Sequence, residues 1–284
     1  MKLYRYFHLL SLDIVLGALA SSLFAARLFS ANPGWVWWVS LTLTVWIIYM
    51  GSHMAESWKW RKKPGREIHR FIIKNRRPLL LIMALLIMAD SLLIFNFLDK
   101  IFLKAALGLG GAGLLFYTMR YIFKKSSLDF IPGELFVLLF YLLGTWMGPY
   151  LSRGIEPGSS HLLILIMMAG ILLLNLGIIS LYDVQSKTRL GISLLSVVLG
   201  KKKTRNLMFA TVASVFLLAL LQFMVYGTGK NSQLSLVLSG MCVLYLLMLT
   251  APSLFRKQEI YRLTAEAILW MGFLSLLTGS VPIQ

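Results

Sequence analysis

Long apolar runs separated by short polar segments dominate the sequence. Nine of these runs can cross the hydrocarbon core of a bilayer, for which about 20 residues at helical rise suffice. Because a helix satisfies all its backbone hydrogen bonds within one segment, we expect each run to form a helix. The predicted spans are residues 9–29, 35–56, 78–98, 101–123, 132–151, 160–183, 206–227, 232–252 and 263–281.

Composition agrees with this pattern. Of the 284 residues, 58% are hydrophobic and only 14% are charged, which is far too apolar for a soluble domain. No small-residue cleavage site follows the first apolar run, so we expect it to be retained as a helix. The sequence therefore predicts an all-α polytopic membrane bundle that forms a single transmembrane domain over residues 1–284.

The positions of the basic residues predict an orientation. A net charge of +17 is compatible with nucleic-acid binding, but the 28 Lys and Arg residues lie between the apolar runs and form no separate basic domain. If the N-terminus is cytoplasmic, 23 of the 28 fall on the cytoplasmic side, as the positive-inside rule requires. We expect the C-terminus on the opposite side, contact with membrane lipids and no nucleic-acid partner.

Two long loops, at about residues 57–77 and 184–205, mark the cytoplasmic side. Both are rich in charge, and long loops of compact proteins are often functional. In the spans that feed them, Ser52 and Glu56 are four residues apart, as are Asp183 and Lys187 if the helix continues that far. The simplest interpretation is that Glu56 and Asp183 are solvated carboxylates at the ends of helices. The alternative is a site shared by these two ends.

Other polar residues within the spans are candidates of lower priority. Asp13 and Asp90 should face the bundle interior, because exposure of a carboxylate to lipid costs several kcal/mol, about 2.5–3.5 on insertion scales. Asn175 lies about two turns before Asp183 and either lines a cavity or forms an interhelical hydrogen bond. The histidines at positions 53, 69 and 161 show no metal-ligand spacing in the sequence. The only cysteine, Cys242, excludes a disulfide within the chain.

Both loop-feeding segments resemble motifs of one membrane enzyme family. The second is the more specific, because its order of residues is similar to the family pattern N...YD...D...G..SLA..LG...R. The matching positions are Asn175, Tyr182-Asp183, Gly191, Ser193 and Leu199-Gly200, followed by basic residues, and, in the first segment, Tyr49, His53 and Arg77-Pro78-Leu79. On these residues the chain resembles the UbiA superfamily of intramembrane prenyltransferases.

The resemblance implies a fold, a chemistry and a site. Family members place nine helices around a central cavity, and aspartates at the ends of helices 2 and 6 hold Mg²⁺ ions that bridge to the diphosphate of a polyprenyl donor. The opening segment SLDIVLGALASSLFAARLF is similar to a bacterial branch, which implies the bacterial inner membrane. The implied roles are metal ligation and catalysis by Glu56 and Asp183, diphosphate binding by Lys187, Arg189, Arg76 and Arg77, and lining of the cavity by Asn175, Ser52, His53 and Tyr182.

The departures from the family pattern concern the metal. Ser52 stands where an aspartate is expected, and Lys187 stands where the second aspartate of the second motif belongs. A lysine repels a metal ion, so the ordinary two-metal mechanism is disfavoured. Two alternatives stay open: one Mg²⁺ between Glu56 and Asp183, or basic side chains that contact the diphosphate directly. Lys187 and Arg189 can equally face anionic lipid heads.

The implied function is therefore transfer of a polyprenyl group from an isoprenoid diphosphate to a lipophilic acceptor, which can be aromatic. The alternative is a catalytically inactive relative that binds isoprenoid, quinone or other lipid, or that serves as a structural subunit of a membrane complex. A transporter is less well supported, because the glycines and prolines do not mark matching broken helices in two halves of the chain.

Overall fold

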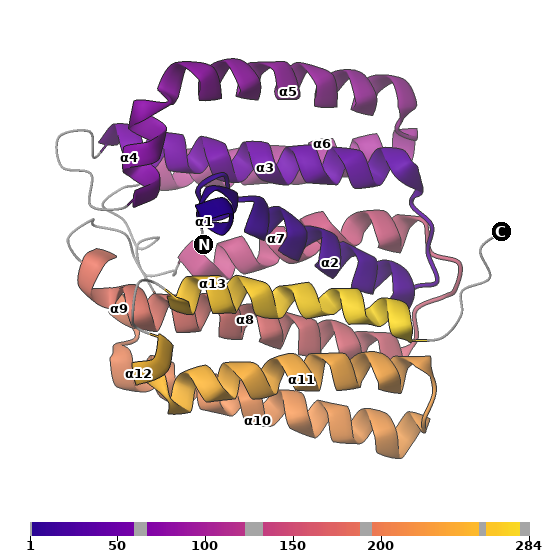
Figure 1. Cartoon of the computed structure of the whole chain (residues 1–284). Helices are drawn as coiled ribbons and strands as arrows, with labels where there is room; N and C mark the ends of the chain where they lie inside the picture. Colours follow the sequence, from indigo (N-terminus) through magenta and orange to yellow (C-terminus); the bar gives the residue numbers. More distant parts are fainter. Residues whose placement is uncertain (1, 60–66, 123–132, 188–194, 256–259, 279–284) are drawn as a thin grey trace.

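The computed structural model describes residues 2–59, 67–122, 133–187, 195–255 and 260–278, and all regular structure in these ranges is helical (Figure 1). The elements are α1 (Lys2–Leu9), α2 (Leu12–Leu28), α3 (Gly34–Lys59), α4 (Glu67–Lys74), α5 (Arg76–Phe97), α6 (Lys100–Ile122), α7 (Gly133–Leu151), α8 (Ser159–Lys187), α9 (Leu195–Val198), α10 (Lys201–Tyr226), α11 (Lys230–Thr250), α12 (Pro252–Phe255), α13 (Ile260–Leu269) and the 3₁₀ helix η4 (Trp270–Leu277).

The helices confirm an integral multi-pass membrane protein. Within the described ranges, seven segments are long and apolar enough to cross a membrane: α3, α5, α7, α8, α10, α11 and the combined α13–η4. The sequence predicted nine spans. The other two predicted spans, α2 and α6, are also helical, and α2 has only 17 residues.

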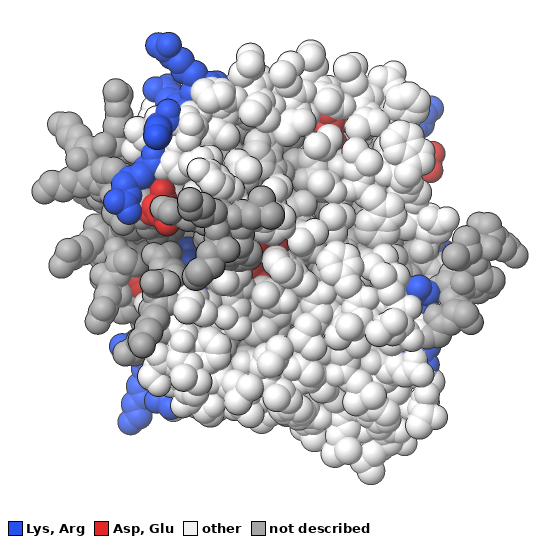
Figure 2. Space-filling view, viewed as in Figure 1, with Lys and Arg blue, Asp and Glu red and all other residues white. Residues whose placement is uncertain are grey.

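The long helices run side by side, with α5 at one rim of the bundle and α10 and α11 at the other (Figure 1). One end of the bundle, called the charged end below, is where α3 and α8 end and where α5 and α10 begin. Figure 2 shows Lys and Arg side chains at both ends of the viewed face, most of them at the charged end, and almost none in the band between. An apolar band between charged ends is the surface that a bilayer requires.

Helix α8 is the core of the bundle. Half of its membrane-spanning window is buried, whereas only 11% of the corresponding window of α5 is buried. Close packing of α8 on α10 depends on Gly177, where a Cβ atom would lie 2.3 Å from the sulfur of Met208. Small residues at helix contacts allow such close approach in membrane proteins. The motif residues near the end of α8 are therefore carried by the most firmly packed helix.

The two long loops predicted at about residues 57–77 and 184–205 contain more helix than the sequence indicated. Helix α3 continues to Lys59 and α4 follows within the first loop, because Ile72 and His69 are three residues apart and present one buried face. In the second, α8 continues to Lys187, as the spacing of Asp183 and Lys187 required, and α9 precedes α10. Gly200 separates α9 from α10 with φ of +81°, which favours glycine.

Candidate functional site

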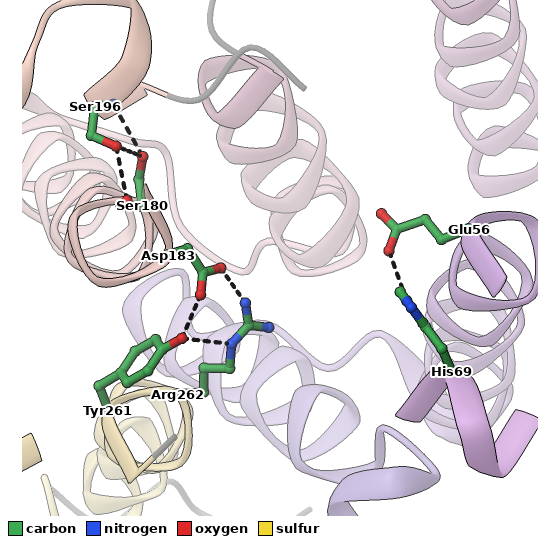
Figure 3. Close-up of polar contacts among 7 residues, drawn as sticks. All are labelled: Glu56, His69, Ser180, Asp183, Ser196, Tyr261 and Arg262. Carbon is green, nitrogen blue, oxygen red and sulfur yellow. Dashed lines mark hydrogen bonds and ion pairs between the residues drawn. The ribbon is translucent and has the colours of Figure 1, made fainter. Parts of the chain in front are cut away.

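Helices α3 and α8 carry the two motif carboxylates to the same end of the bundle. Glu56 lies in the last turn of α3, and Asp183 lies in the last turns of α8. Figure 3 shows the two side chains apart, each with partners of its own. The two carboxylates share one end of the bundle but contact different residues, and these partners define what each carboxylate can do.

Asp183 is neutralised by two residues of α13. The hydroxyl of Tyr261 donates to one carboxylate oxygen, and the guanidinium of Arg262 donates to the other (Figure 3). The Asp183 side chain is 2% exposed and that of Arg262 is 17% exposed, so the pair is largely shielded from water. The Tyr261 ring also stacks on Tyr182 with ring centres 4.8 Å apart. This motif aspartate therefore fixes α13 against α8.

Asn175 joins three helices two turns deeper in the bundle. Its amide nitrogen donates to the hydroxyl of Tyr245 on α11, at 3.1 Å, and to the carbonyl of Ala265 on α13, at 2.8 Å. The Tyr245 hydroxyl donates to the same carbonyl, at 3.0 Å. Of the two roles considered for Asn175, the interhelical hydrogen bond is the one that the structure contains.

Glu56 contacts histidines. The Nε2 atom of His69 on α4 lies 3.4 Å from a Glu56 carboxylate oxygen (Figure 3). His53 precedes Glu56 by three residues on α3, and the ligand atoms of the three side chains all lie within 4.8 Å of one another. The sequence showed no metal-ligand spacing among its histidines, because His69 comes from another helix.

Ionisable side chains of several helices, some of them only partly buried, interact electrostatically across the bundle. The carboxylate of Glu266 on α13 interacts electrostatically with the phenols of Tyr49 on α3 and Tyr141 on α7. It also interacts with Asp13 and Arg262, which connects the cluster to the charged end. Ionisable groups inside a membrane bundle are usually functional.

Asp13 and Asp90 face the interior, as predicted. Asp13 is paired with His8, whose Nδ1 atom lies 2.5 Å from a carboxylate oxygen, and Asp90 accepts a hydrogen bond from the Thr44 hydroxyl at 2.8 Å. Both carboxylates are buried. Asp13 also accepts a hydrogen bond from the Ile14 amide at 3.1 Å, whereas the second oxygen of Asp90 is buried and accepts no hydrogen bond from the described residues.

A pocket of about 440 Å³ opens beside α8 at the charged end. One wall is apolar and includes Leu181 and Met248, and the other carries Lys201, Lys202 and Arg205 from the first turns of α10. Tyr182, which was predicted to line a cavity, borders this pocket and donates to the carbonyl of Met248 at 2.8 Å. Three cations beside apolar side chains fit a lipid with an anionic head group.

Helix α9 is tied to α8 beside this pocket. The hydroxyls of Ser180 and Ser196 are 2.9 Å apart, and the Ser196 amide donates to the Ser180 hydroxyl at 3.1 Å (Figure 3). The carboxylate of Glu134 on α7 accepts a hydrogen bond from the Leu195 amide at the start of α9. These contacts fix the segment that leads into the basic first turn of α10.

The residues predicted to bind diphosphate lie on different helices and do not all belong to one described site. The guanidinium of Arg76 stacks over the Trp58 ring at 4.5 Å, and Arg77 is exposed beside it. Lys187 is the last residue of α8, and Arg189 lies outside the described residues. Ser52, which was predicted to line the cavity, is exposed instead, and its hydroxyl donates to the carbonyl of Tyr49 at 2.8 Å.

No protein-family model, no curated protein and no solved structure matches the chain. The likeness to the UbiA superfamily accordingly rests on the motif residues of the sequence.

The carboxylates as placed do not fit a Mg²⁺ ion bridging the two motifs. One oxygen of Asp183 accepts a hydrogen bond from Tyr261 and the other from Arg262. A guanidinium in direct contact with the carboxylate repels a divalent cation. Glu56 has imidazoles beside it, whereas Mg²⁺ prefers oxygen ligands in octahedral geometry. Neither carboxylate is therefore presented as a magnesium ligand.

Sequence reasoning missed several residues of the site. Glu266 lies within the predicted span 263–281, and an ionisable residue in a span is a signal that the sequence already offered. The sequence placed Tyr261 and Arg262 in a loop, where Arg262 contributed only to the count of basic residues. Their pairing with Asp183 spans 78 and 79 positions and leaves no local pattern in the sequence.

Proposed function

We propose that the protein is a UbiA-like integral membrane prenyltransferase that transfers a polyprenyl group from an isoprenoid diphosphate to a lipophilic acceptor. The observation that carries the proposal is the common end of α3 and α8, where Glu56 and Asp183 stand at the positions that the family motifs occupy. The polar cluster around Glu266 lies inside the same bundle, where an acceptor head group needs hydrogen-bonding partners.

In this proposal, basic side chains bind the diphosphate directly. Arg262 lies beside the motif aspartate, and Lys201, Lys202 and Arg205 line the adjoining pocket, in addition to Arg76, Arg77, Lys187 and Arg189 named from the sequence. Guanidinium groups bind phosphate oxygens in a bidentate manner and ammonium groups act as point charges. They stabilise the negative charge that develops on the leaving diphosphate.

Prenyl transfer requires groups in the bundle that stabilise a carbocation and accept a proton. The allylic carbon–oxygen bond breaks and its electron pair leaves with the diphosphate; the cation then takes an electron pair from the acceptor, which loses a proton. Tyr49 and Tyr141, which are partly exposed, can stabilise the cation through their ring faces. Glu266 on α13 interacts electrostatically with these phenols, and we assign to it the uptake of the proton.

The proposal includes a membrane orientation. We place nine spans in the bilayer, with the charged end and the N-terminus in the cytoplasm, the C-terminus on the opposite side and the bacterial inner membrane as the location. The excess of Lys and Arg on the predicted cytoplasmic segments supports this orientation. Helix α1 lies at the charged end and η4 ends at the opposite end, in agreement with an odd number of crossings (Figure 1).

The second candidate is a non-catalytic isoprenoid, quinone or lipid binder, alone or as a subunit of a membrane complex. One observation favours it: Tyr261 and Arg262 together occupy both Asp183 oxygens, the atoms that the family chemistry uses for metal. The pocket lined by Lys201, Lys202 and Arg205 suits such a ligand equally well.

The two candidates differ in the release of diphosphate. The test is incubation of the detergent-purified protein with farnesyl or geranylgeranyl diphosphate and its own co-purified lipids, with and without Mg²⁺, followed by mass spectrometry and a diphosphate assay. The prenyltransferase releases diphosphate and forms a prenylated lipid, and Glu266→Gln slows transfer while it leaves donor binding intact. A donor that binds and is recovered unchanged under every condition identifies the binder.

A further inference from the structure

The histidines around Glu56 are organised by two helices. His53 and Glu56 are one turn apart on α3, so their side chains lie on the same face. His69 is supplied by α4, and its Nε2 atom lies 3.4 Å from a Glu56 oxygen. The potential ligand atoms of all three residues lie within 4.8 Å of one another. They therefore form a three-sided cluster at the charged end.

Helix α4 holds His69 in place by packing. The residue is 3% exposed, and Ile72, one turn later on the same face, packs into an apolar cluster with Trp46, Met50 and Leu79. At the end of α3, the Ser57 hydroxyl donates to the His53 carbonyl at 2.6 Å. The imidazole of His69 is thus directed toward α3 by the burial of α4, which gives a preorganised site on helical elements.

The distances suit a small transition metal ion. Metal–nitrogen bonds of about 2.0–2.1 Å in tetrahedral geometry place neighbouring ligand atoms roughly 3.3–3.5 Å apart. The His69–Glu56 separation of 3.4 Å already has this value, and the limit of 4.8 Å for the whole cluster requires a closure of little more than about 1 Å.

The donor set decides which metal is appropriate. Two imidazoles and one carboxylate suit Zn²⁺ and other late first-row ions, and three protein ligands leave a fourth position open for water or a ligand oxygen. Mg²⁺ prefers oxygen donors alone. The cluster also differs from the aspartate motifs of the family that the sequence resembles, because two of its three donors are nitrogen.

We propose that His53, Glu56 and His69 form a binding site for a divalent transition metal ion of the Zn²⁺ type, with one coordination position open. The site does not rest on the proposed prenyl transfer, because its ligands are close together without any isoprenoid. If transfer occurs at this end of the bundle, the open position is available to a phosphate oxygen.

The test measures Zn²⁺ binding by the full-length protein, purified in detergent without a histidine tag and freed of metal with a chelator. Titration against a fluorescent zinc indicator is expected to give one ion per chain. Glu56→Gln and His69→Ala should each weaken binding at least about tenfold, since even outer-shell changes cost about 10–100-fold. Mg²⁺ in large excess should not compete.

Two matched variants keep the test decisive. His161→Ala removes a histidine on α8 at the opposite end of the bundle, and Asp183→Asn removes the other motif carboxylate; both should leave Zn²⁺ affinity unchanged. Thermal unfolding of each variant without metal verifies that it is folded. Equal binding by wild type and Glu56→Gln, or a loss in Asp183→Asn equal to that in Glu56→Gln, would overturn the proposal. No outcome depends on transferase activity, so failure of transfer leaves this inference intact.

Discussion

The two carboxylates at the charged end have different neighbours and therefore different roles. Asp183 accepts hydrogen bonds from a phenol and a guanidinium on α13 and is almost completely buried, whereas Glu56 is 40% exposed and lies beside two imidazoles. Their sequence contexts are alike, since each ends a membrane helix before a basic segment. Residue type at a helix end thus does not determine chemistry; the partner supplied by a distant helix does.

The largest effect is expected at Arg262. Replacement by Gln leaves the Asp183 carboxylate buried without its counter-charge, a change that costs about 3–5 kcal/mol in comparable buried pairs. We expect a strongly lowered thermal midpoint in detergent, with a smaller loss for Arg262→Lys. In the double variant Asp183→Asn/Arg262→Gln, part of the stability should return, because the unpaired charge is gone. Additive losses in the double variant would show that the pair is not coupled.

A smaller effect is expected at Asn175. Its replacement by Leu leaves the Ala265 carbonyl and the Tyr245 hydroxyl with fewer partners, which we expect to cost about 1–3 kcal/mol. The measurement is again the thermal midpoint. Tyr245→Phe, which removes one hydroxyl of the same three-residue network, provides the comparison and should cost less. If Asn175→Leu is as stable as wild type, the network does not hold α13 in place.

Loss of the carboxylate should reduce stability much less at Glu56 than at Asp183. Since its side chain is 40% exposed, Glu56→Gln should change stability in the absence of metal by no more than about 1 kcal/mol. Parallel melting curves of Glu56→Gln and Asp183→Asn test this contrast directly. Equal destabilisation of the two variants would remove the distinction between a buried, ion-paired carboxylate and a partly exposed one.

The smallest effect concerns pH. The hydrogen bond to Asp13 raises the pKa of His8 above its ordinary value, against the lowering by burial and by Arg262. A raised pKa means that the pair stabilises the fold at low pH and that this stability is lost as pH rises through the folded-state pKa. The difference in thermal midpoint between wild type and His8→Gln should shrink from about pH 6 to about pH 9. Because His8 is partly exposed, we expect less than about 1 kcal/mol.

Much of the fold could be predicted from the sequence. Long apolar runs give helices with bounds close to those observed, since a membrane leaves no other way to satisfy the backbone. The burial of Asp13 and Asp90 also followed from the cost of exposing a carboxylate to lipid. Helix α4 was missed because its eight residues lie within a strongly basic segment, where charge concealed the apolar face of Ile72.

The partners of the site residues could not be predicted in the same way. Arg262 reaches Asp183, and His69 reaches Glu56, only after α13 and α4 have packed against α8 and α3. Such pairs depend on tertiary packing, and a single sequence contains no pattern that links them. Glu266 differs, because its position within an apolar run is visible in the sequence.

The most direct test of the central claim is photo-crosslinking with an isoprenoid diphosphate that carries a diazirine on its chain, followed by peptide mapping. The account predicts labelling on the interior-facing residues of α3, α8 and α13, near Tyr49 and Glu266, and competition by unlabelled geranylgeranyl diphosphate. Label confined to the lipid-facing surface of α5, unaffected by competitor, would contradict an isoprenoid diphosphate site within the bundle.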